Sequence, residues 1–319
     1  MKPVLPLILF LACLTTWAEP CLAQAGKILA AASSWGYQLQ NADPDELAAS
    51  KYEVLVMDYS ADGTDAGAYQ ASQIKAIRDR GKIVLAYLSI GEAEKYRFYW
   101  QAGWVPGNPA WLGPKNPQWP DNYKVRYWYA GWWTEALQPY LDRILNAGFD
   151  GVYLDIIDAY WYWHETGVNA VNFTADKMVE LVEKIAAYTR ASHPGFILCP
   201  QNGESIIDDV SMSAMRNRYF LAIDAVGVED LFYHFGNLAD QRYRFQMLRL
   251  YHQAGKKIFN IEYLGRSQWS AYLKSVCAQP LPIIPYAGMP DRALDELIPD
   301  FPRPNCGGRS AGAMLLLLP

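Results

Sequence analysis

The chain has 319 residues, a net charge of −5, and an unusual number of aromatic side chains, with 12 Trp and 22 Tyr. It contains no run of Lys or Arg that would meet a phosphate backbone, so we predict that nucleic acid is not a partner. Beyond its first residues, no segment approaches the roughly 20 consecutive apolar residues of a membrane helix, and we predict no membrane span.

The first 25 residues have the pattern of an export signal. Lys2 supplies the charged start, residues 4–13 form a short apolar run, and Ala23-Gln24-Ala25 is a small-residue cleavage site. We therefore expect a signal peptide over residues 1–25 that is cleaved near Ala25, and a secreted or periplasmic mature protein.

The rest of the chain alternates short β-branched runs with helical patterns, which is typical of βα units and a parallel sheet. Eight strands are predicted, at 35–40, 53–59, 83–90, 151–157, 196–201, 225–228, 257–263 and 282–286. Helices are predicted at 68–80, 133–147, 175–192, 237–254 and 267–277. Gly81, Gly148 and Gly255 follow three of these helices, where a glycine commonly ends a helix. We expect an α/β fold of the (β/α)8 TIM-barrel type, in a single domain over residues 26–298, because such barrels usually take about 250 residues.

Two insertions follow predicted strands. Residues 92–132, rich in Pro, Gly and Trp, join the third strand to its helix by a loop far longer than usual. Residues 160–173 follow the fourth strand and add Trp161 and Trp163. Long loops are commonly functional, so we expect these aromatic side chains to form a substrate-binding wall. Those of the first insertion are Trp100, Trp104, Trp111, Trp119, Tyr123, Tyr127 and Trp128.

The C-terminal segment, residues 299–319, shows neither strand nor helix periodicity and is expected to be a poorly ordered tail. Three cysteines remain after the predicted cleavage. Cys277 and Cys306 can pair, although the sequence leaves this open, and Cys199 lies in an apolar run that is typical of a buried thiol.

Carboxylates occur at or just beyond the ends of five predicted strands. Active sites of TIM barrels lie at these C-terminal strand ends. A charge within an apolar strand is costly unless it is paired or functional, which makes Asp155 and Glu262 the informative positions. Two facing carboxylates are what glycosidic cleavage needs, since one protonates the leaving oxygen while the other attacks the anomeric carbon or activates water. The strand-end acids are Asp58, Glu92, Glu94, Asp155, Asp158, Glu229, Asp230 and Glu262.

Other chemistries are less well supported. No two of the four histidines have metal-ligand spacing on one predicted element, so neither a zinc centre nor any other cofactor is predicted. No Gly-x-Ser-x-Gly motif is present, which disfavours a serine hydrolase.

Five motifs of this chain resemble those of glycoside hydrolase family 114, which includes endo-α-1,4-polygalactosaminidases. They are VMDY at 56–59, YLSIGEAEKYR at 87–97, GFDGVYLDIID at 148–158, QNG at 201–203 and VEDLFY at 228–233. The resemblance runs over residues 35–286 and implies a TIM-barrel hydrolase of an amino-sugar polysaccharide.

The resemblance also implies roles for individual residues. Asp155 matches the catalytic Asp and Glu229 the acid/base Glu, which implies a retaining double displacement, although the sequence alone does not separate retention from inversion. Glu262 on the seventh strand is the rival second carboxylate. Substrate contacts are expected from Asp58, Tyr87, Ser89, Glu92, Tyr153, Asp158, Gln201, Asn202, Glu262 and Tyr286.

Two alternatives remain open at this point. The chain could be a polysaccharide-binding barrel without turnover, or a hydrolase of a different glycan. The full set of strand-end acids favours an enzyme.

Overall fold

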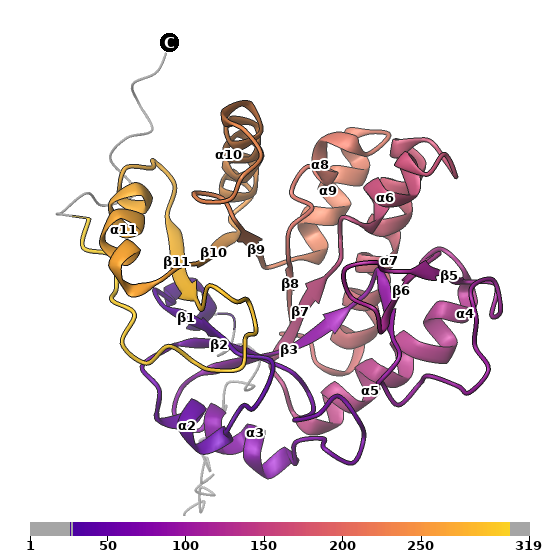
Figure 1. The fold of residues 1–319 in the computed structure, drawn as a ribbon, viewed down its shortest axis with the longest axis horizontal. Helices are drawn as coiled ribbons and strands as arrows, with labels where there is room; N and C mark the ends of the chain where they lie inside the picture. The colour runs from indigo at the N-terminus through magenta and orange to yellow at the C-terminus, as the bar shows by residue number, and fades with distance from the viewer. Residues whose placement is uncertain (1–25, 27, 307–319) are drawn as a thin grey trace, which may run out of the picture.

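The structure is a computed structural model that describes residues 26 and 28–306. It confirms the (β/α)8 barrel, with eight parallel strands at its centre and helices around them (Figure 1). The predicted signal peptide lies outside the described residues. The barrel strands are β1 Trp35–Tyr37, β2 Val54–Met57, β3 Ile83–Ser89, β7 Gly151–Asp155, β8 Ile197–Pro200, β9 Ala225–Glu229, β10 Lys257–Tyr263 and β11 Ile283–Gly288.

The strands follow one another around the barrel in chain order. Parallel ladders join β1-β2-β3-β7-β8 and β9-β10-β11, and a parallel bridge between Gln201 and Gly227 links the two sets. Between β11 and β1, the indole of Trp35 donates a hydrogen bond of 3.0 Å to the carbonyl of Ile284. The carboxyl ends of all eight strands therefore lie at one face, as in other α/β barrels.

Helices surround the strands. They are α2 Pro44–Ala49, α3 Ala71–Arg78, α4 Ala130–Trp132, the π-helical turn η1 Trp133–Leu137, α5 Gln138–Ala147, α6 Ala159–Glu165, α7 Val171–Ser192, α8 Ile206–Asp209, α9 Ser213–Ala222, α10 Leu238–Gln253, the 3-10 turn η2 Arg266–Gln268 and α11 Trp269–Cys277. The five predicted helices are present, whereas α2, α4, α6, α8 and α9 were not predicted. Gly148 ends α5 with a φ of 85°, the left-handed conformation that favours glycine. No helix in the described part of the chain is both long and apolar enough to span a membrane.

Aromatic rings fill the barrel interior. Trp35 on β1 lies at its centre, with ring centroids 6.0 Å from Tyr153 and 5.1 Å from Phe259. Gly227 on β9 makes room for this packing, because a Cβ there would lie 1.9 Å from the hydroxyl oxygen of Tyr153. The inside of the barrel is thus a packed core, and substrate is confined to its open face.

The insertion after β3 has its own structure instead of being a plain loop. It forms a small antiparallel sheet of β4 Glu92–Glu94, β5 Leu112–Lys115 and β6 Asn122–Val125, in the order β4-β6-β5. Its aromatic side chains pack mainly against one another, with ring centroids 4.8 Å apart for Trp100 and Tyr123 and 4.9 Å apart for Trp104 and Trp111. These rings form the core of the insertion.

The segment after β11 is packed against the barrel as far as the structure describes it. Cys277 at the end of α11 forms a disulfide with Cys306, and Phe301 is buried against Trp269 and Tyr272. Residues 299–306 therefore differ from the predicted poorly ordered tail, because a cross-link and an aromatic anchor hold them. Residues 307–319 lie outside the described part of the chain. Cys199 is buried and free, as expected.

Candidate active site

Two carboxylates stand at the carboxyl ends of β7 and β9. Asp155 is the last residue of β7 and Glu229 the last residue of β9, and each is partly exposed where its strand leaves the buried core. Asp155 and Glu229 also interact electrostatically with each other. The fold thus brings together the two residues that the sequence assigned to catalysis.

Neighbouring side chains hold Glu229 in place. Asn202 donates from Nδ2 to one Glu229 carboxylate oxygen over 2.9 Å, and its own carbonyl oxygen accepts from the Glu229 backbone N–H over 2.9 Å. The Tyr263 hydroxyl donates to the other carboxylate oxygen. Arg244 donates to the Glu229 backbone carbonyl over 3.0 Å. Glu229 is therefore fixed at both its backbone and its carboxylate.

Asp155 lies in a different environment. The Tyr87 hydroxyl donates to one of its oxygens over 2.8 Å, and the Ile156 backbone N–H donates to the other over 2.8 Å. Burial, followed by the charge on Glu229, raises the pKa of Asp155 to about 8, and the two hydrogen bonds oppose this rise only in part. In the free site, Asp155 thus retains a proton at neutral pH.

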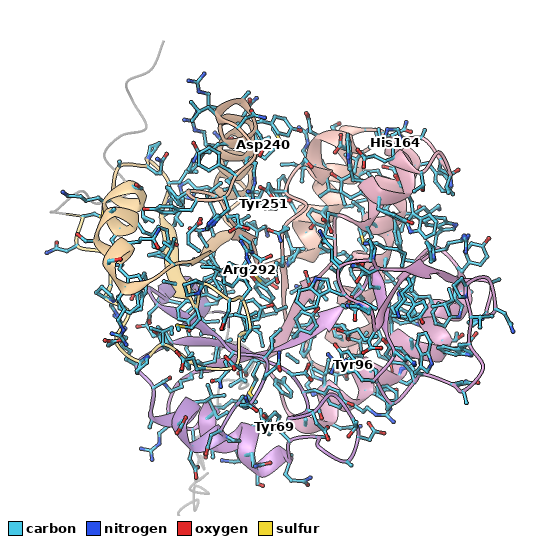
Figure 2. All side chains as sticks on the ribbon, viewed as in Figure 1. Tyr69, Tyr96, His164, Asp240, Tyr251 and Arg292 are labelled. Carbon is cyan, nitrogen blue, oxygen red and sulfur yellow. A yellow bond between two sulfur atoms is a disulfide. The ribbon has the colours of Figure 1, made fainter. Side chains whose placement is uncertain are left out.

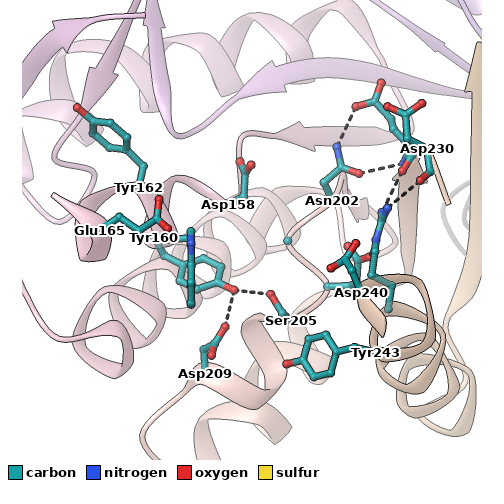
Figure 3. Close-up of a pocket in the computed structure, with 15 residues that line it drawn as sticks. Asp158, Tyr160, Tyr162, Glu165, Asn202, Ser205, Asp209, Asp230, Asp240 and Tyr243 are labelled. Carbon is teal, nitrogen blue, oxygen red and sulfur yellow. Dashed lines mark hydrogen bonds and ion pairs between the residues drawn. The ribbon is translucent and has the colours of Figure 1, made fainter. Parts of the chain in front are cut away.

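A pocket of about 900 Å³ opens beside Glu229 (Figure 3). Asp155 is not in its wall, but it interacts with two residues that are, Glu229 and Asp158. Asp158 is exposed in the pocket. Desolvation by the surrounding protein raises its pKa, and the positive charge of Lys124 opposes this rise. The wall consists of Asp158, Tyr160, Trp161, Tyr162, Glu165, Asn202, Gly203, Glu204, Ser205, Asp209, Glu229, Asp230, Asp240, Tyr243 and Arg244.

The pocket is strongly acidic. Seven carboxylates line it, against a single basic side chain, Arg244. Arg244 is itself paired with Glu204 and also donates to the backbone carbonyls of Glu229 and Asp230. The net negative charge of the wall favours a cationic ligand.

Three of the predicted substrate-binding carboxylates are instead occupied by the protein itself. Asp58 forms a bidentate ion pair with the buried Arg97, at 2.8 and 2.7 Å. Glu92 is fully buried and accepts from Lys124, Asn116 and Asn122 within the insertion.

Glu262 is also fully buried. It accepts from the backbone N–H groups of Leu231, Phe232 and Tyr233, which are within 3.1 Å. Burial raises the pKa of Glu262 to about 7. Because these amides surround its carboxylate, Glu262 supports the chain just after Glu229 and does not line the pocket, which corrects its prediction as a substrate contact and as the rival second carboxylate.

The predicted aromatic and polar substrate contacts fall into two groups, one at the active site and one buried away from it. Tyr87 is buried and contacts Asp155, and Asn202 lines the pocket. Four others are buried away from the pocket wall, because they serve the barrel core and its turns: Ser89 donates to the Glu92 carbonyl, Tyr153 packs on Trp35, Gln201 accepts from Tyr37, and the Tyr286 hydroxyl accepts from the Ile298 backbone.

Only part of the predicted aromatic wall lines the pocket. No aromatic residue of the first insertion lines the pocket, because most of them are packed within the insertion. Trp163 is buried, whereas Trp161 is 43% exposed and lines the pocket together with Tyr160, Tyr162 and Tyr243.

Sequence reasoning missed Tyr263, Arg244 and Arg292. Arg292 lies near the centre of the view in Figure 2, where it pairs with Asp230 at 2.8 Å and covers the ring of Tyr263, with its Cζ 4.2 Å from the centroid. Tyr263 ends the strand that carries Glu262, so the rule that active-site residues lie at the C-terminal ends of strands could have identified it. No local pattern points to Arg244 or Arg292. Among the described residues, no group of three His, Cys, Asp or Glu side chains could hold a metal ion.

An α/β barrel with paired carboxylates at the ends of β7 and β9 is the arrangement of a glycoside hydrolase, and comparison with known proteins agrees. Residues 17–294 match the family described as glycoside-hydrolase family GH114. The chain therefore belongs to family GH114 and is a glycoside hydrolase, whose substrate is a carbohydrate.

Relatives extend across bacteria and archaea. The chain is 38% identical over 278 residues to an uncharacterized protein of Thermotoga maritima, covering 83% of each chain. It is 38% identical over 273 residues to an uncharacterized protein of Methanocaldococcus jannaschii, covering 82% of this chain and 77% of that protein. The glycoside hydrolase domain of PelA from Pseudomonas aeruginosa has a similar fold, with a TM-score of 0.60, 16% identity, and coverage of 84% of this chain and 98% of that domain.

Proposed function

We propose that this protein is an exported hydrolase of α-1,4-linked galactosamine-containing polysaccharide. The observation that carries the proposal is the charge of the pocket, where seven carboxylates face one already paired arginine. An unsubstituted amino sugar is cationic at neutral pH, so such a polymer complements this wall. The galactosamine identity and the linkage come from the motif resemblance to endo-α-1,4-polygalactosaminidases.

In the proposed mechanism, the proton of the pair passes from Asp155 to Glu229 when substrate binds, and Glu229 then protonates the glycosidic oxygen while the carboxylate of Asp155 attacks the anomeric carbon. The bond to the leaving oxygen breaks and a glycosyl ester forms on Asp155. Glu229, now ionised, then removes a proton from a water molecule, which attacks the anomeric carbon and releases Asp155 as a carboxylate. Configuration is retained because the carbon is displaced twice.

The proton on Asp155 in the free site affects which kind of substrate the site favours. A nucleophilic Asp155 must be ionised, yet burial and the charge of Glu229 raise its pKa to about 8. A cation bound in the pocket would lower that pKa, since opposite charge favours the ionised form. A cationic amino sugar would therefore help to prepare the nucleophile, an effect that a neutral sugar would not have.

The test is release of reducing ends by the purified mature protein from partly deacetylated polygalactosamine, polyglucosamine and neutral polysaccharides. Asp155→Asn and Glu229→Gln are expected to lose at least about 100-fold in rate, because each removes a reacting group. Glu180→Gln makes the same change in an exposed carboxylate on α7 that pairs with Lys177 outside the pocket, and it is the matched control.

The polysaccharides from which reducing ends are released, and the variants that lose this activity, distinguish among the candidate functions. Release from galactosaminan that is lost in both active-site variants and retained in the control supports the proposal. Release from another glycan alone would replace the proposed substrate while keeping the hydrolase. Equal rates in Asp155→Asn and the parent would rule out the assigned nucleophile.

Export is part of the proposal and rests on the signal pattern of residues 1–25. N-terminal sequencing of the protein recovered outside the cytoplasm should find a chain that begins near Gly26. Recovery of uncleaved chain from the cytoplasm alone would contradict it.

A further inference from the structure

The pocket extends beyond Glu229 into a second region, which we call the outer lobe. It is formed by Tyr160, Trp161 and Glu165 of α6 and by Asp209 of α8. Figure 3 shows Tyr160 and Asp209 at one side of the pocket, Asn202 and Asp230 at the other, and Asp158 between them. The mechanism above uses none of the outer-lobe residues.

An exposed aromatic face lies in the outer lobe. Trp161 is 43% exposed, although it belongs to the pocket wall. Its described ring neighbours are His164 and Tyr160, with centroids 5.4 and 6.5 Å away and both contacts edge-on. Trp163 and Trp133 each have a cation over the ring, whereas no cation of the described residues lies over Trp161. An indole face in a pocket can accept the face of a sugar ring or an ammonium group.

The acids of the pocket divide into two sets. Glu204 is paired with Arg244 and Asp230 with Arg292. Within the described residues, no Lys or Arg forms an ion pair with Glu165 or Asp209, whereas the charge of Arg244 acts on Asp240. The outer lobe thus holds two carboxylates, Glu165 and Asp209, that no described Lys or Arg pairs with, in the same wall as Trp161.

Asp209 is also held in position. The hydroxyl of the buried Tyr160 lies 2.7 Å from an Asp209 oxygen and 2.7 Å from the Ser205 hydroxyl. A carboxylate fixed by a buried tyrosine keeps its orientation toward the lobe, which lowers the entropic cost of binding a ligand there.

We infer that the outer lobe is a second sugar subsite, which binds a positively charged amino-sugar residue of the same polymer while another residue of that polymer lies beside Asp155 and Glu229. Trp161 supplies the stacking surface and Asp209 a carboxylate for the ammonium group. This inference rests on the proposed function, because it takes the substrate to be an amino-sugar chain.

The test is the chain-length dependence of hydrolysis, with galactosamine oligomers from the disaccharide to the hexasaccharide. In the parent, kcat/KM should rise with length until the outer lobe is filled. Trp161→Ala should lose about tenfold in kcat/KM on the hexasaccharide and less on the disaccharide, the scale of one desolvated cation–π contact. Asp209→Asn can still accept from Tyr160 and should show the same trend with a smaller loss.

Trp119→Ala is the matched comparison. Trp119 is 62% exposed and lies in the insertion outside the pocket, so its loss should leave the length dependence as in the parent. Thermal melts of all variants establish that they fold. In addition, binding of the hexasaccharide to Asp155→Asn should weaken about tenfold when Trp161→Ala is added.

The outcomes separate the two proposals. A parent that cleaves galactosaminan, with unchanged length dependence in Trp161→Ala, overturns the outer-lobe subsite and leaves the proposed function standing. A length effect in Trp119→Ala but not in Trp161→Ala would place the subsite on the insertion instead. If the parent neither cleaves nor binds any galactosamine oligomer, both proposals fail.

Discussion

Glu229 lines the pocket and Asp155 interacts with it from outside the pocket wall, and the two carboxylates have different surroundings. Glu229 accepts from two side-chain donors, Asn202 and Tyr263, whereas desolvation and the charge of Glu229 both raise the pKa of Asp155. In the free site this inequality leaves the proton on Asp155, whereas the proposed mechanism needs it on Glu229, so substrate binding must shift the proton from one acid to the other. Both the pH dependence and the stability of the protein should reflect this arrangement.

Asp155→Asn is expected to stabilise the protein at alkaline pH. The pKa of Asp155 is raised to about 8 in the folded chain, so the folded state keeps a proton that the unfolded state releases near the ordinary value of an aspartate. The stabilising contribution of Asp155 is complete below that ordinary value, and it is lost as the pH rises through about 8. An asparagine side chain does not ionise, so the variant does not lose this stability as the pH rises.

Thermal melts at pH 4 and pH 9 measure the effect. Asp155→Asn and the parent should differ least at pH 4, whereas at pH 9 the variant should melt higher, by on the order of 2–4 °C for each kcal/mol recovered. Glu180→Gln, with an exposed carboxylate, should follow the parent at both values. A variant that melts below the parent at pH 9 would show that the Asp155 carboxylate is stabilising there.

Tyr263→Phe should lower kcat while leaving KM nearly unchanged. Tyr263 donates to Glu229 but does not line the pocket, so its hydroxyl positions the acid/base without touching substrate. Phenylalanine keeps the ring beneath Arg292, and loss of a hydrogen bond to a charged group corresponds to about 10- to 100-fold in rate. Tyr188→Phe removes a similar bond, to Asp142, between two residues that do not line the pocket, and is the control. A rise in KM instead would mean that Tyr263 contacts substrate.

Strand-end position predicted several pocket residues but not which carboxylates are free. Asp155, Asp158 and Glu229 lie where expected, yet Asp58 and Glu92, at equivalent strand ends, are neutralised by side chains of the insertion. Their partners, Arg97 and Lys124, are 39 and 32 residues away in sequence. Long-range pairing of this kind leaves no local pattern, so only the folded chain distinguishes a free acid from a paired one.

At the scale of elements, the insertion after β3 is attached to the barrel by a buried arginine. Arg97 pairs with Asp58 at the end of β2 and with Glu94 on β4, and all three side chains are less than a tenth exposed. The aromatic composition of the insertion predicted a binding wall, because exposed and packed aromatic residues have the same sequence signature. Its small sheet supplies the backbone pairing that lets these rings pack as a core.

Arg97→Met is expected to destabilise the protein by about 3–5 kcal/mol, because it leaves Asp58 and Glu94 buried without a counter-charge. Chemical denaturation measures the change. Lys75→Met removes one partner of the exposed Lys75–Asp79 pair on α3 and should cost no more than about 1 kcal/mol. Equal losses in the two variants would show that the buried ion pairs do not hold the insertion.

At the scale of the whole molecule, the sequence predicted all eight barrel strands because each is a short apolar run bounded by turn residues. It did not predict how the barrel ends. No helix follows β11 within the described residues; instead, the chain returns over α11 and β11, with Phe301 buried between Trp269 and Tyr286. The disulfide between Cys277 and Cys306, which spacing alone left open, also joins this segment to α11.

Replacing both cysteines, as Cys277→Ser with Cys306→Ser, should destabilise the protein by roughly 3–4 kcal/mol. The disulfide closes a loop between residues 29 positions apart, and a loop of this length restricts the unfolded chain by about that free energy. The melting temperature should fall on the order of 10 °C. Reductant should lower the melting temperature of the parent to that of the double variant and leave the variant unchanged, since the other described cysteine, Cys199, is already free. A parent that melts at the same temperature with and without reductant would mean that Phe301 and its neighbours hold this segment without the cross-link.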